Sequence, residues 1–212
     1  MAERLFDQMT RGLKALDIQV TLAEPLTDYV NLLHKWSKSY NLTAVRRPED
    51  MVVKHVLDSL TLVPHLSSFQ RLCDVGTGAG LPGIPLALCF SDKEFVLLDS
   101  NGKKTRFLYQ VREQLKLDNV SIVEGRAETY EPEQGFDVVI SRAFADLNRM
   151  CNLTAHLLET EGVWLAMKSQ TVDTEIADLS ASFEICGQID LVVPGLEEMR
   201  QLVVLRRGEN KK

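Results

Sequence analysis

The stretch DVGTGAGLPGIPLAL, residues 74–88, decides the fold of this chain. It continues a short apolar run, RLCDV, and leads into a second apolar run, so it predicts a strand, a glycine-rich turn and a helix. Such a turn lets a ligand approach the backbone closely. Read from Gly78, the letters fit G-x-G-x-x-G, the pattern of dinucleotide-binding proteins. Read from Asp74, they give D-x-G-x-G-x-G, which is associated with S-adenosylmethionine, so the stretch leaves two cofactors open.

The segments around this turn alternate between strand-like and helix-like patterns. Strands are predicted at residues 71–75, 94–100, 120–125, 136–144, 162–168, 183–193 and 200–207, and helices at 81–90, 103–117, 147–159 and 172–181. Alternation of this kind is typical of an α/β Rossmann-like fold, in which helices cover both faces of a mostly parallel sheet. Only the short break PGLEEM separates the last two strands, which predicts an antiparallel hairpin.

The first part of the chain carries helical patterns only. Apolar residues recur at helical spacing in two segments, and a third helix is predicted to begin at Pro48 and to end near Pro64. We therefore expect an N-terminal helical region at 1–65, a Rossmann-like domain at 66–208, which the motifs described below assign to a methyltransferase, and a frayed tail at 209–212.

Composition and charge indicate the cellular compartment of the protein and the kind of partner that it can bind. No run approaches the roughly 18 consecutive apolar residues of a membrane helix, and the N-terminus mixes both charge signs, unlike a signal peptide. The four cysteines are widely spaced and form no C-x-x-C pair, so we expect a cytoplasmic protein with no membrane association and no metal site. The net charge is −6, but five bases stand against two acids between Asn31 and His55. Such a local basic face can serve a polyanion.

The two candidate cofactors differ in charge, and the acids near the turn bear on that difference. Asp99 lies at the end of the second predicted strand, 21 residues after Gly78. An acid at this position binds the ribose hydroxyls of either cofactor. The alternative is that Asp99 caps the following helix. Asp74 discriminates, because its charge would repel a pyrophosphate and attract the methionine ammonium of S-adenosylmethionine, directly or through water. Glu128, in the turn after the third strand, is predicted to lie beside the adenine; a surface turn residue is the alternative.

Four stretches together resemble one protein family. They are LLHKWSKSYNLTAVRRPEDMVVKHVLDSL, DVGTGAGLPGIPLA, LLDSNGKKTRFL and FDVVISRAFADL. From about Leu22 to Arg206 the chain is similar to the bacterial glucose-inhibited division protein B family, also called RsmG, the 16S ribosomal RNA guanine-N7 methyltransferases. GTGxGLPGIP and ISRAF are far narrower signals than a generic methyltransferase turn.

The resemblance implies a fold, a reaction and a set of site residues. The fold is that of the class I S-adenosylmethionine-dependent methyltransferases, with a seven-stranded sheet and a small N-terminal helical region. The substrate is N7 of one guanine in 16S ribosomal RNA, within the small ribosomal subunit or an assembly intermediate. The family's cofactor positions match Gly76, Leu81, Asp99, Ala127, Glu128 and Arg142. Together with Asp74, Gly78 and Gly80 of the glycine turn, these are the predicted cofactor-binding residues. The alternatives are an NAD-dependent oxidoreductase and a non-catalytic RNA-binding assembly factor that retains the cofactor fold.

The segment after the fourth predicted strand carries the catalytic hypothesis. Enzymes that methylate exocyclic amines usually have (D/N)-P-P-(Y/F) there, but this chain has Ser-Arg-Ala-Phe at 141–144. Guanine N7 carries no proton, so its methylation needs positioning and electrostatics rather than an acid–base pair. We predict Arg142 as the catalytic residue, in contact with guanine O6, a phosphate or the cofactor. The alternative is an ion pair with Asp74, Asp137 or Glu128.

Five residues are predicted to contact the RNA. They are Asn41 and Arg46 in a loop between helices, His55 on the third helix, Phe144 as a stacking partner of the flipped base, and Lys168 as a phosphate contact. The alternatives are helix packing for His55 together with Asp58, a core position for Phe144 and a solvated side chain for Lys168.

Overall fold

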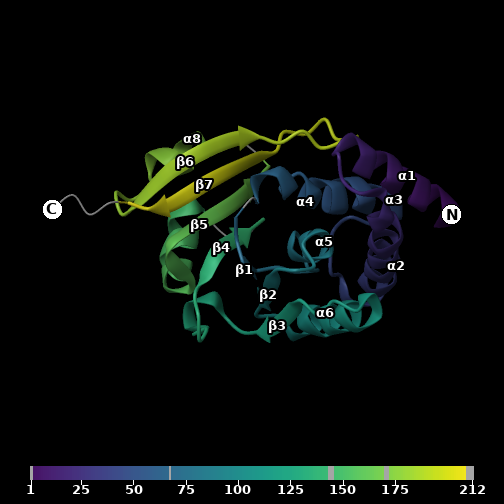
Figure 1. The fold of residues 1–212 in the computed structure, drawn as a ribbon, viewed down its shortest axis with the longest axis horizontal. Helices are drawn as coiled ribbons and strands as arrows, with labels where there is room; N and C mark the ends of the chain where they lie inside the picture. Colours follow the sequence, from purple (N-terminus) through teal and green to yellow (C-terminus); the bar gives the residue numbers. More distant parts are fainter. Residues whose placement is uncertain (1, 67, 143–145, 170–171, 209–212) are drawn as a thin grey trace.

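A seven-stranded sheet forms the centre of the protein, in the order β3-β2-β1-β4-β5-β7-β6 (Figure 1). The computed structural model describes residues 2–66, 68–142, 146–169 and 172–208. The strands are β1 (Arg71–Val75), β2 (Glu94–Asp99), β3 (Val120–Glu124), β4 (Phe136–Ser141), β5 (Leu158–Lys168), β6 (Phe183–Asp190) and β7 (Gln201–Arg207). Neighbouring strands from β3 to β5 are parallel, whereas β7 is antiparallel to both β5 and β6. The predicted mostly parallel sheet and its final hairpin are confirmed.

Helices cover both faces of this sheet. They are α1 (Ala2–Ala15), α2 (Ala23–Tyr40), α3 (Pro48–Met51), α4 (Asp58–Leu60), α5 (Gly83–Cys89), α6 (Gly102–Leu115), α7 (Leu147–Thr154) and α8 (Asp173–Ala177). In β2, Phe95 and Leu97 pack with helices α1 to α6, whereas Val96 and Leu98 pack with α7 and the neighbouring strands. Successive side chains of a strand point to opposite faces, so a strand with both faces covered is apolar throughout.

The beginning of β5 differs from the prediction. The helix predicted at 147–159 ends at Thr154, and β5 begins at Leu158 rather than at Gly162. The pairing of β4 with β5 shifts register between Phe136 and Val138, so residues 159–162 form an irregular start of the strand. These residues are polar or glycine and carry no strand pattern, which is why the sequence did not indicate them.

The predicted helix after Pro48 contains a π-helical turn. The structure divides this segment into α3, the π-helical turn η2 (Val52–Leu57) and α4. Apolar residues keep one face buried throughout, so the helical pattern persists across the turn. Turns of this type occur frequently at functional sites, and η2 contains His55.

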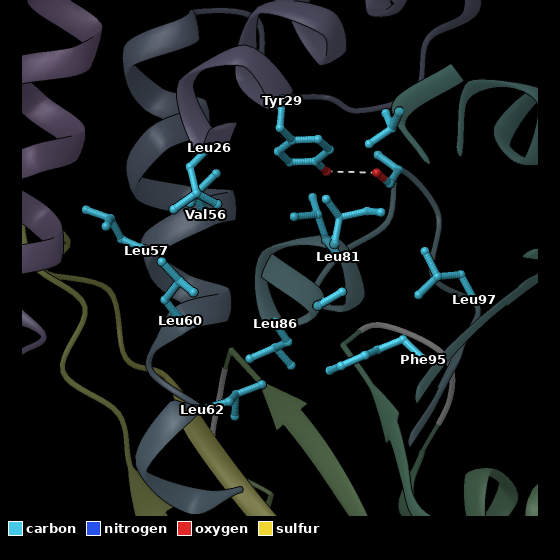
Figure 2. Close-up of a cluster of buried hydrophobic side chains, with 14 of the residues drawn as sticks. Leu26, Tyr29, Val56, Leu57, Leu60, Leu62, Leu81, Leu86, Phe95 and Leu97 are labelled. Atoms are coloured by element: carbon cyan, nitrogen blue, oxygen red, sulfur yellow. Dashed lines mark hydrogen bonds between the residues drawn. The ribbon is translucent and has the colours of Figure 1, made fainter. Parts of the chain in front are cut away.

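The N-terminal helices share one hydrophobic core with the sheet. Leu26 of α2 and Val56 of η2 belong to the same buried cluster as Leu81 and Leu97 (Figure 2). The hydroxyl of buried Tyr29 donates a hydrogen bond of 2.8 Å to the carbonyl oxygen of Ala79 in the glycine turn (Figure 2). The predicted boundary between a helical region and a Rossmann-like domain at residue 65 therefore stays a proposal. The expected frayed tail, residues 209–212, lies outside the described residues.

Two further properties concern the described part of the chain. None of its helices has both the length and the apolarity needed to span a membrane. Among the same residues, no three or more His, Cys, Asp or Glu side chains gather closely enough to hold a metal ion.

Candidate cofactor and substrate site

The turn between β1 and α5 requires its glycines. Gly76, Gly78 and Gly80 have φ values of 68°, 64° and 91°, in the left-handed region that other residues rarely adopt. A Cβ at Gly80 would lie 2.5 Å from Cγ1 of Ile84 and 2.8 Å from Cδ2 of Leu108. A Cβ at Gly78 would meet nothing closer than 3.9 Å. The glycines at 76 and 78 supply conformation, whereas Gly80 also allows α5 and α6 to approach the turn.

These geometries predict unequal costs for two substitutions. We expect Gly78→Ala to lower the free energy of unfolding by about 1 kcal/mol, the cost of a left-handed non-glycine residue. Gly80→Ala adds overpacking against Ile84 and Leu108 and is expected to cost roughly 3 kcal/mol in total. Urea denaturation of both variants measures the two costs, and an equal or reversed order would contradict this account.

Most of the amide groups of the turn are bonded within the protein. The Gly78 amide donates to Oδ2 of Asp99 at 2.8 Å, and the Gly83 amide donates to Oδ2 of Asp74 at 2.8 Å. Backbone carbonyl oxygens accept from four further amides of the turn, those of Gly76, Thr77, Gly80 and Leu81. A dinucleotide site presents such amides to a pyrophosphate. Here carboxylates occupy that role, so the turn does not suit a pyrophosphate.

Asp74 lies beneath the turn and is completely buried. Its Oδ2 accepts hydrogen bonds from the Thr77 hydroxyl at 2.6 Å and from the Gly83 amide, whereas its Oδ1 is buried with no partner among the described residues. Burial raises the pKa of Asp74 from 3.8 to about 6, against the opposing effect of these hydrogen bonds. Asp74 therefore fixes the turn onto α5. The predicted contact with the methionine ammonium would run through Oδ1 and stays a prediction.

The raised pKa of Asp74 has a consequence for stability. Between pH 3.8 and about pH 6 the folded protein binds more protons at this group than the unfolded chain does, so stability falls as pH rises through this window. We expect the free energy of unfolding of the wild type, relative to Asp74→Asn, to fall by up to about 3 kcal/mol between pH 4 and pH 7. Urea denaturation at both pH values, with Asp92→Asn as a surface control, measures it. A difference independent of pH would refute the assignment.

Three cavities lie in sequence along the carboxyl ends of the strands. We call the first the β2–β3 cavity, because Asp99 at the end of β2 and Gly125 after β3 line it; its volume is about 370 Å³. The second, the loop cavity, is lined by the glycine turn and has a volume of about 250 Å³. The third, the arginine cavity, is lined by Arg142 and Arg200 and has a volume of about 260 Å³. Gly76 and Lys104 line both the β2–β3 cavity and the loop cavity, and Arg142 lines both the loop cavity and the arginine cavity. The three cavities therefore form one trough, at the edge where open α/β sheets bind their ligands.

The β2–β3 cavity brings together four of the nine predicted cofactor residues. Gly76, Asp99, Ala127 and Glu128 all line it. Oδ1 of Asp99 accepts from the Asn101 amide at 2.9 Å, and Oδ2 lies 3.3 Å from Nζ of Lys104. Leu81 and Gly78 line the loop cavity instead, and Gly80 is buried behind it. The lining of the β2–β3 cavity thus includes two acids, Asp99 and Glu128, and the exposed Gly76.

The arginine cavity is organised around the buried carboxylate of Asp58, whose side chain is 3 % exposed. Nη1 of Arg142 lies 3.3 Å from Oδ2 of Asp58, and Nε of Arg200 lies 3.0 Å from Oδ1. Nη1 of Arg142 also donates to the carbonyl oxygen of Lys54 in the π-helical turn, at 3.1 Å. The ion-pair partner of Arg142 is thus Asp58 and not one of the three acids considered from the sequence.

His55 lies in the wall of the same cavity. Its Nε2 is 2.7 Å from the Thr43 hydroxyl, and its Nδ1 is 3.4 Å from Nη1 of Arg142. Burial and the positive charge of Arg142 lower the pKa of His55 from 6.5 to about 4. His55 is therefore neutral at pH 7 and weakly basic. Burial likewise raises the pKa of Asp58, against the effect of the two guanidinium groups.

The remaining predicted RNA contacts are distributed over the surface. Lys168 lines the arginine cavity, with Nζ 2.7 Å from Oε2 of Glu175. Asn41 ends α2 in a left-handed conformation, and its exposed side chain accepts from Arg46 at 3.2 Å. Phe144 lies outside the described residues. All of these RNA contacts stay predictions.

Five basic residues that line the trough were not predicted as site residues from the sequence; they are Lys54, Lys104, Arg126, Arg149 and Arg200. Arg200 meets Asp58 across 142 positions of chain, and no local pattern indicates such a distant pair. Lys104 stands at the first turn of α6, in a segment where a lysine is ordinary at a solvated position. Its position five residues after Asp99, at the carboxyl end of a parallel strand, is the one signal that points toward the site.

The trough fits S-adenosylmethionine better than a dinucleotide. The carboxylate of Asp99 on the Gly78 amide and the unpaired buried carboxylate oxygen of Asp74 suit a cationic nucleoside better than a pyrophosphate. The strand order, with β7 antiparallel between β5 and β6, completes the architecture. Fold and site together define a class I S-adenosylmethionine-dependent methyltransferase.

Comparisons with known proteins agree and are more specific. The structure resembles the ribosomal protein L11 methylase of Lactobacillus delbrueckii subsp. bulgaricus (TM-score 0.54, 13% identity, 72% of this chain and 77% of that chain). It also resembles the glycopeptide N-methyltransferase MtfA complexed with S-adenosyl-L-methionine (TM-score 0.60, 11% identity, 72% and 94%). These likenesses show the fold. The family described as rRNA small subunit methyltransferase G (GidB) matches residues 22–204.

Curated relatives carry the same description. Ribosomal RNA small subunit methyltransferase G of Shewanella amazonensis is 48% identical over 205 residues, which cover 97% of this chain and 98% of the relative. The protein of the same name from Hydrogenovibrio crunogenus is 50% identical over 182 residues, covering 86% and 84%. This chain belongs to the rRNA small subunit methyltransferase G family. The predicted family, fold and cofactor are confirmed, and the oxidoreductase alternative has no support.

Proposed function

We propose that this protein transfers a methyl group from S-adenosylmethionine to N7 of a guanine in 16S ribosomal RNA. The observation that supports it most directly is the adjacency of the loop cavity and the arginine cavity, which share Arg142. A methyl donor in the loop cavity and a guanine base in the arginine cavity would meet at the Arg142 side chain. With this substrate, presented in the small subunit or an assembly intermediate, the protein acts in the cytoplasm.

The cofactor's place follows from the lining of the first two cavities. When bound, S-adenosylmethionine supplies an electrophilic methyl group on its sulfonium. Asp99 would accept hydrogen bonds from the ribose hydroxyls, and Ala127 and Glu128 would flank the adenine. The methionine moiety would lie over Gly76 and Gly78 in the loop cavity, beside Leu81.

The arginine cavity suits a guanine attacked at N7. Guanine N7 has an in-plane lone pair and no proton, so the base needs orientation rather than deprotonation. The cavity offers guanidinium and ammonium donors from Arg142, Lys168 and Arg200, which match guanine O6 and phosphate oxygens. Its one imidazole, His55, has a lowered pKa of about 4 and is a poor general base at pH 7. The lack of an imidazole that is a competent base among the described lining residues favours N7 over an exocyclic amine or a hydroxyl.

A map of modified nucleotides tests the proposal. We expect 16S ribosomal RNA from cells without this gene to lack one 7-methylguanosine, and the purified protein to restore it on isolated small subunits with S-adenosylmethionine. Nuclease digestion with mass spectrometry identifies the missing residue. Unchanged 7-methylguanosine together with normal binding to the subunit would instead favour a non-catalytic assembly factor.

A further inference from the structure

Lys104 lies at the junction of the β2–β3 cavity and the loop cavity. It comes from the first turn of α6, and its side chain is 33 % exposed. Nζ lies 3.3 Å from Oδ2 of Asp99 and 3.9 Å from the position that a Cβ would occupy at Gly78. The ammonium group therefore stands directly over the glycine turn, where the nucleoside and amino-acid halves of the cofactor would join.

The methionine moiety of the cofactor brings a carboxylate into this region, and that carboxylate needs a donor. A carboxylate that leaves water without a cation or hydrogen-bond donors carries a large desolvation cost. Most of the turn amides that bind anions in other glycine turns are used internally, by Asp99, Asp74 and backbone carbonyls. A cationic side chain of the loop cavity therefore suits the carboxylate better than the turn backbone does.

Two cationic side chains line the loop cavity, Lys104 and Arg142. Nη1 of Arg142 is bonded to Asp58 and to the Lys54 carbonyl oxygen, which directs this guanidinium toward the arginine cavity. Lys104 has three ammonium donors, and its ion pair among the described residues, with Asp99, uses one of them. Lys104 thus brings donors to the cofactor's side of the loop cavity.

We propose that Lys104 binds the carboxylate of the methionine moiety of S-adenosylmethionine. Oδ2 of Asp99 would keep its bond with the Gly78 amide, and Lys104 would lie between the Asp99 carboxylate and the carboxylate of the cofactor. Lys104 thereby selects nucleosides that carry an amino-acid carboxylate, and it discriminates against those that end at the sulfur.

The decisive ligand is decarboxylated S-adenosylmethionine, which keeps the sulfonium and the amine and lacks only the carboxylate. In calorimetric titrations we expect Lys104→Ala to raise the Kd of S-adenosylmethionine about tenfold, the order expected for one charge-assisted hydrogen bond. The same variant should bind decarboxylated S-adenosylmethionine within twofold of the wild type. Lys104→Arg should recover most of the lost affinity, and Lys103→Ala, its exposed neighbour, should change neither Kd.

The pattern across the two ligands separates this role from a structural one. If Lys104 acted only by holding Asp99, both ligands would weaken equally in Lys104→Ala, and the proposal would be overturned. Equal binding of S-adenosylmethionine by Lys104→Ala and the wild type would also overturn it. Thermal denaturation checks that each variant is folded, and Lys104→Gln replaces Lys104→Ala if the latter is not.

The inference rests on the cofactor of the proposed function, and the wild-type titration separates the two. If the wild-type protein fails to bind S-adenosylmethionine, the proposed function fails. If it binds and the ligand-specific loss is absent, only the role of Lys104 fails.

Discussion

Arg142→Ala is expected to lower kcat for methylation of small subunits by about 100-fold or more, the typical cost of losing an electrostatic donor at a reacting group. Arg142 is the side chain that the loop cavity and the arginine cavity share. Its guanidinium is held by Asp58 and by the Lys54 carbonyl oxygen, so its remaining donors have a fixed direction. Steady-state kinetics with labelled S-adenosylmethionine measures the change.

The control for this prediction is Arg206→Ala. Arg206 pairs with Glu184 on the surface of the hairpin of β6 and β7, far along the sheet from the glycine turn. We expect its removal to leave kcat unchanged. Arg142→Lys keeps the charge but loses the planar fork, and it should recover little activity. Activity of Arg142→Ala within threefold of the wild type would remove Arg142 from the catalytic machinery.

Asp58→Ala is expected to have the largest effect on stability. The substitution leaves the guanidinium groups of Arg142 and Arg200 without their shared buried anion, and breaking such a buried pair typically costs about 3–5 kcal/mol. Folded Asp58→Ala protein should also lose most activity, because Arg142 loses its orientation. Denaturant unfolding gives the stability, and kinetics below the unfolding transition gives the activity.

Glu198→Ala provides the matched comparison for Asp58→Ala. Glu198 contacts Arg200 at 3.1 Å and Lys54 at 2.8 Å, but it is more than half exposed. Exposed ion pairs contribute little, so we expect almost no change in stability. A loss of stability in Asp58→Ala no greater than in Glu198→Ala would show that the buried cluster is not what holds this side of the trough.

The sequence predicts most of the fold because its signals are local. The alternation of apolar runs and helical spacing predicts a sheet with helices on both faces, and the short break before Arg200 predicts the final hairpin. The errors occur where local pattern and tertiary pairing disagree. Residues 159–162 join β5 through an irregular pairing with β4, and the π-helical turn η2 keeps the apolar pattern of an ordinary helix.

The site is less predictable than the fold because several of its contacts join distant segments. Asp74 is identified by its position before the glycines, but its complete burial follows from the packing of α5 onto the turn. Arg142 is identified by its place after β4, but its partner Asp58 comes from the N-terminal helices. Neither relation leaves a periodic or spacing signal in the chain.

The cluster around Asp58 has a consequence for biosynthesis. Asp58 leaves the ribosome 142 residues before Arg200 does, and chains fold from the N-terminus as they are made. Until the last hairpin has emerged, the helices that carry Asp58 hold an anion that lacks one of its two cations. The ion-pair cluster around Asp58 is therefore completed only near the end of the translation of this chain. The enzyme that we propose to modify ribosomes thus acquires its complete site only as it leaves one.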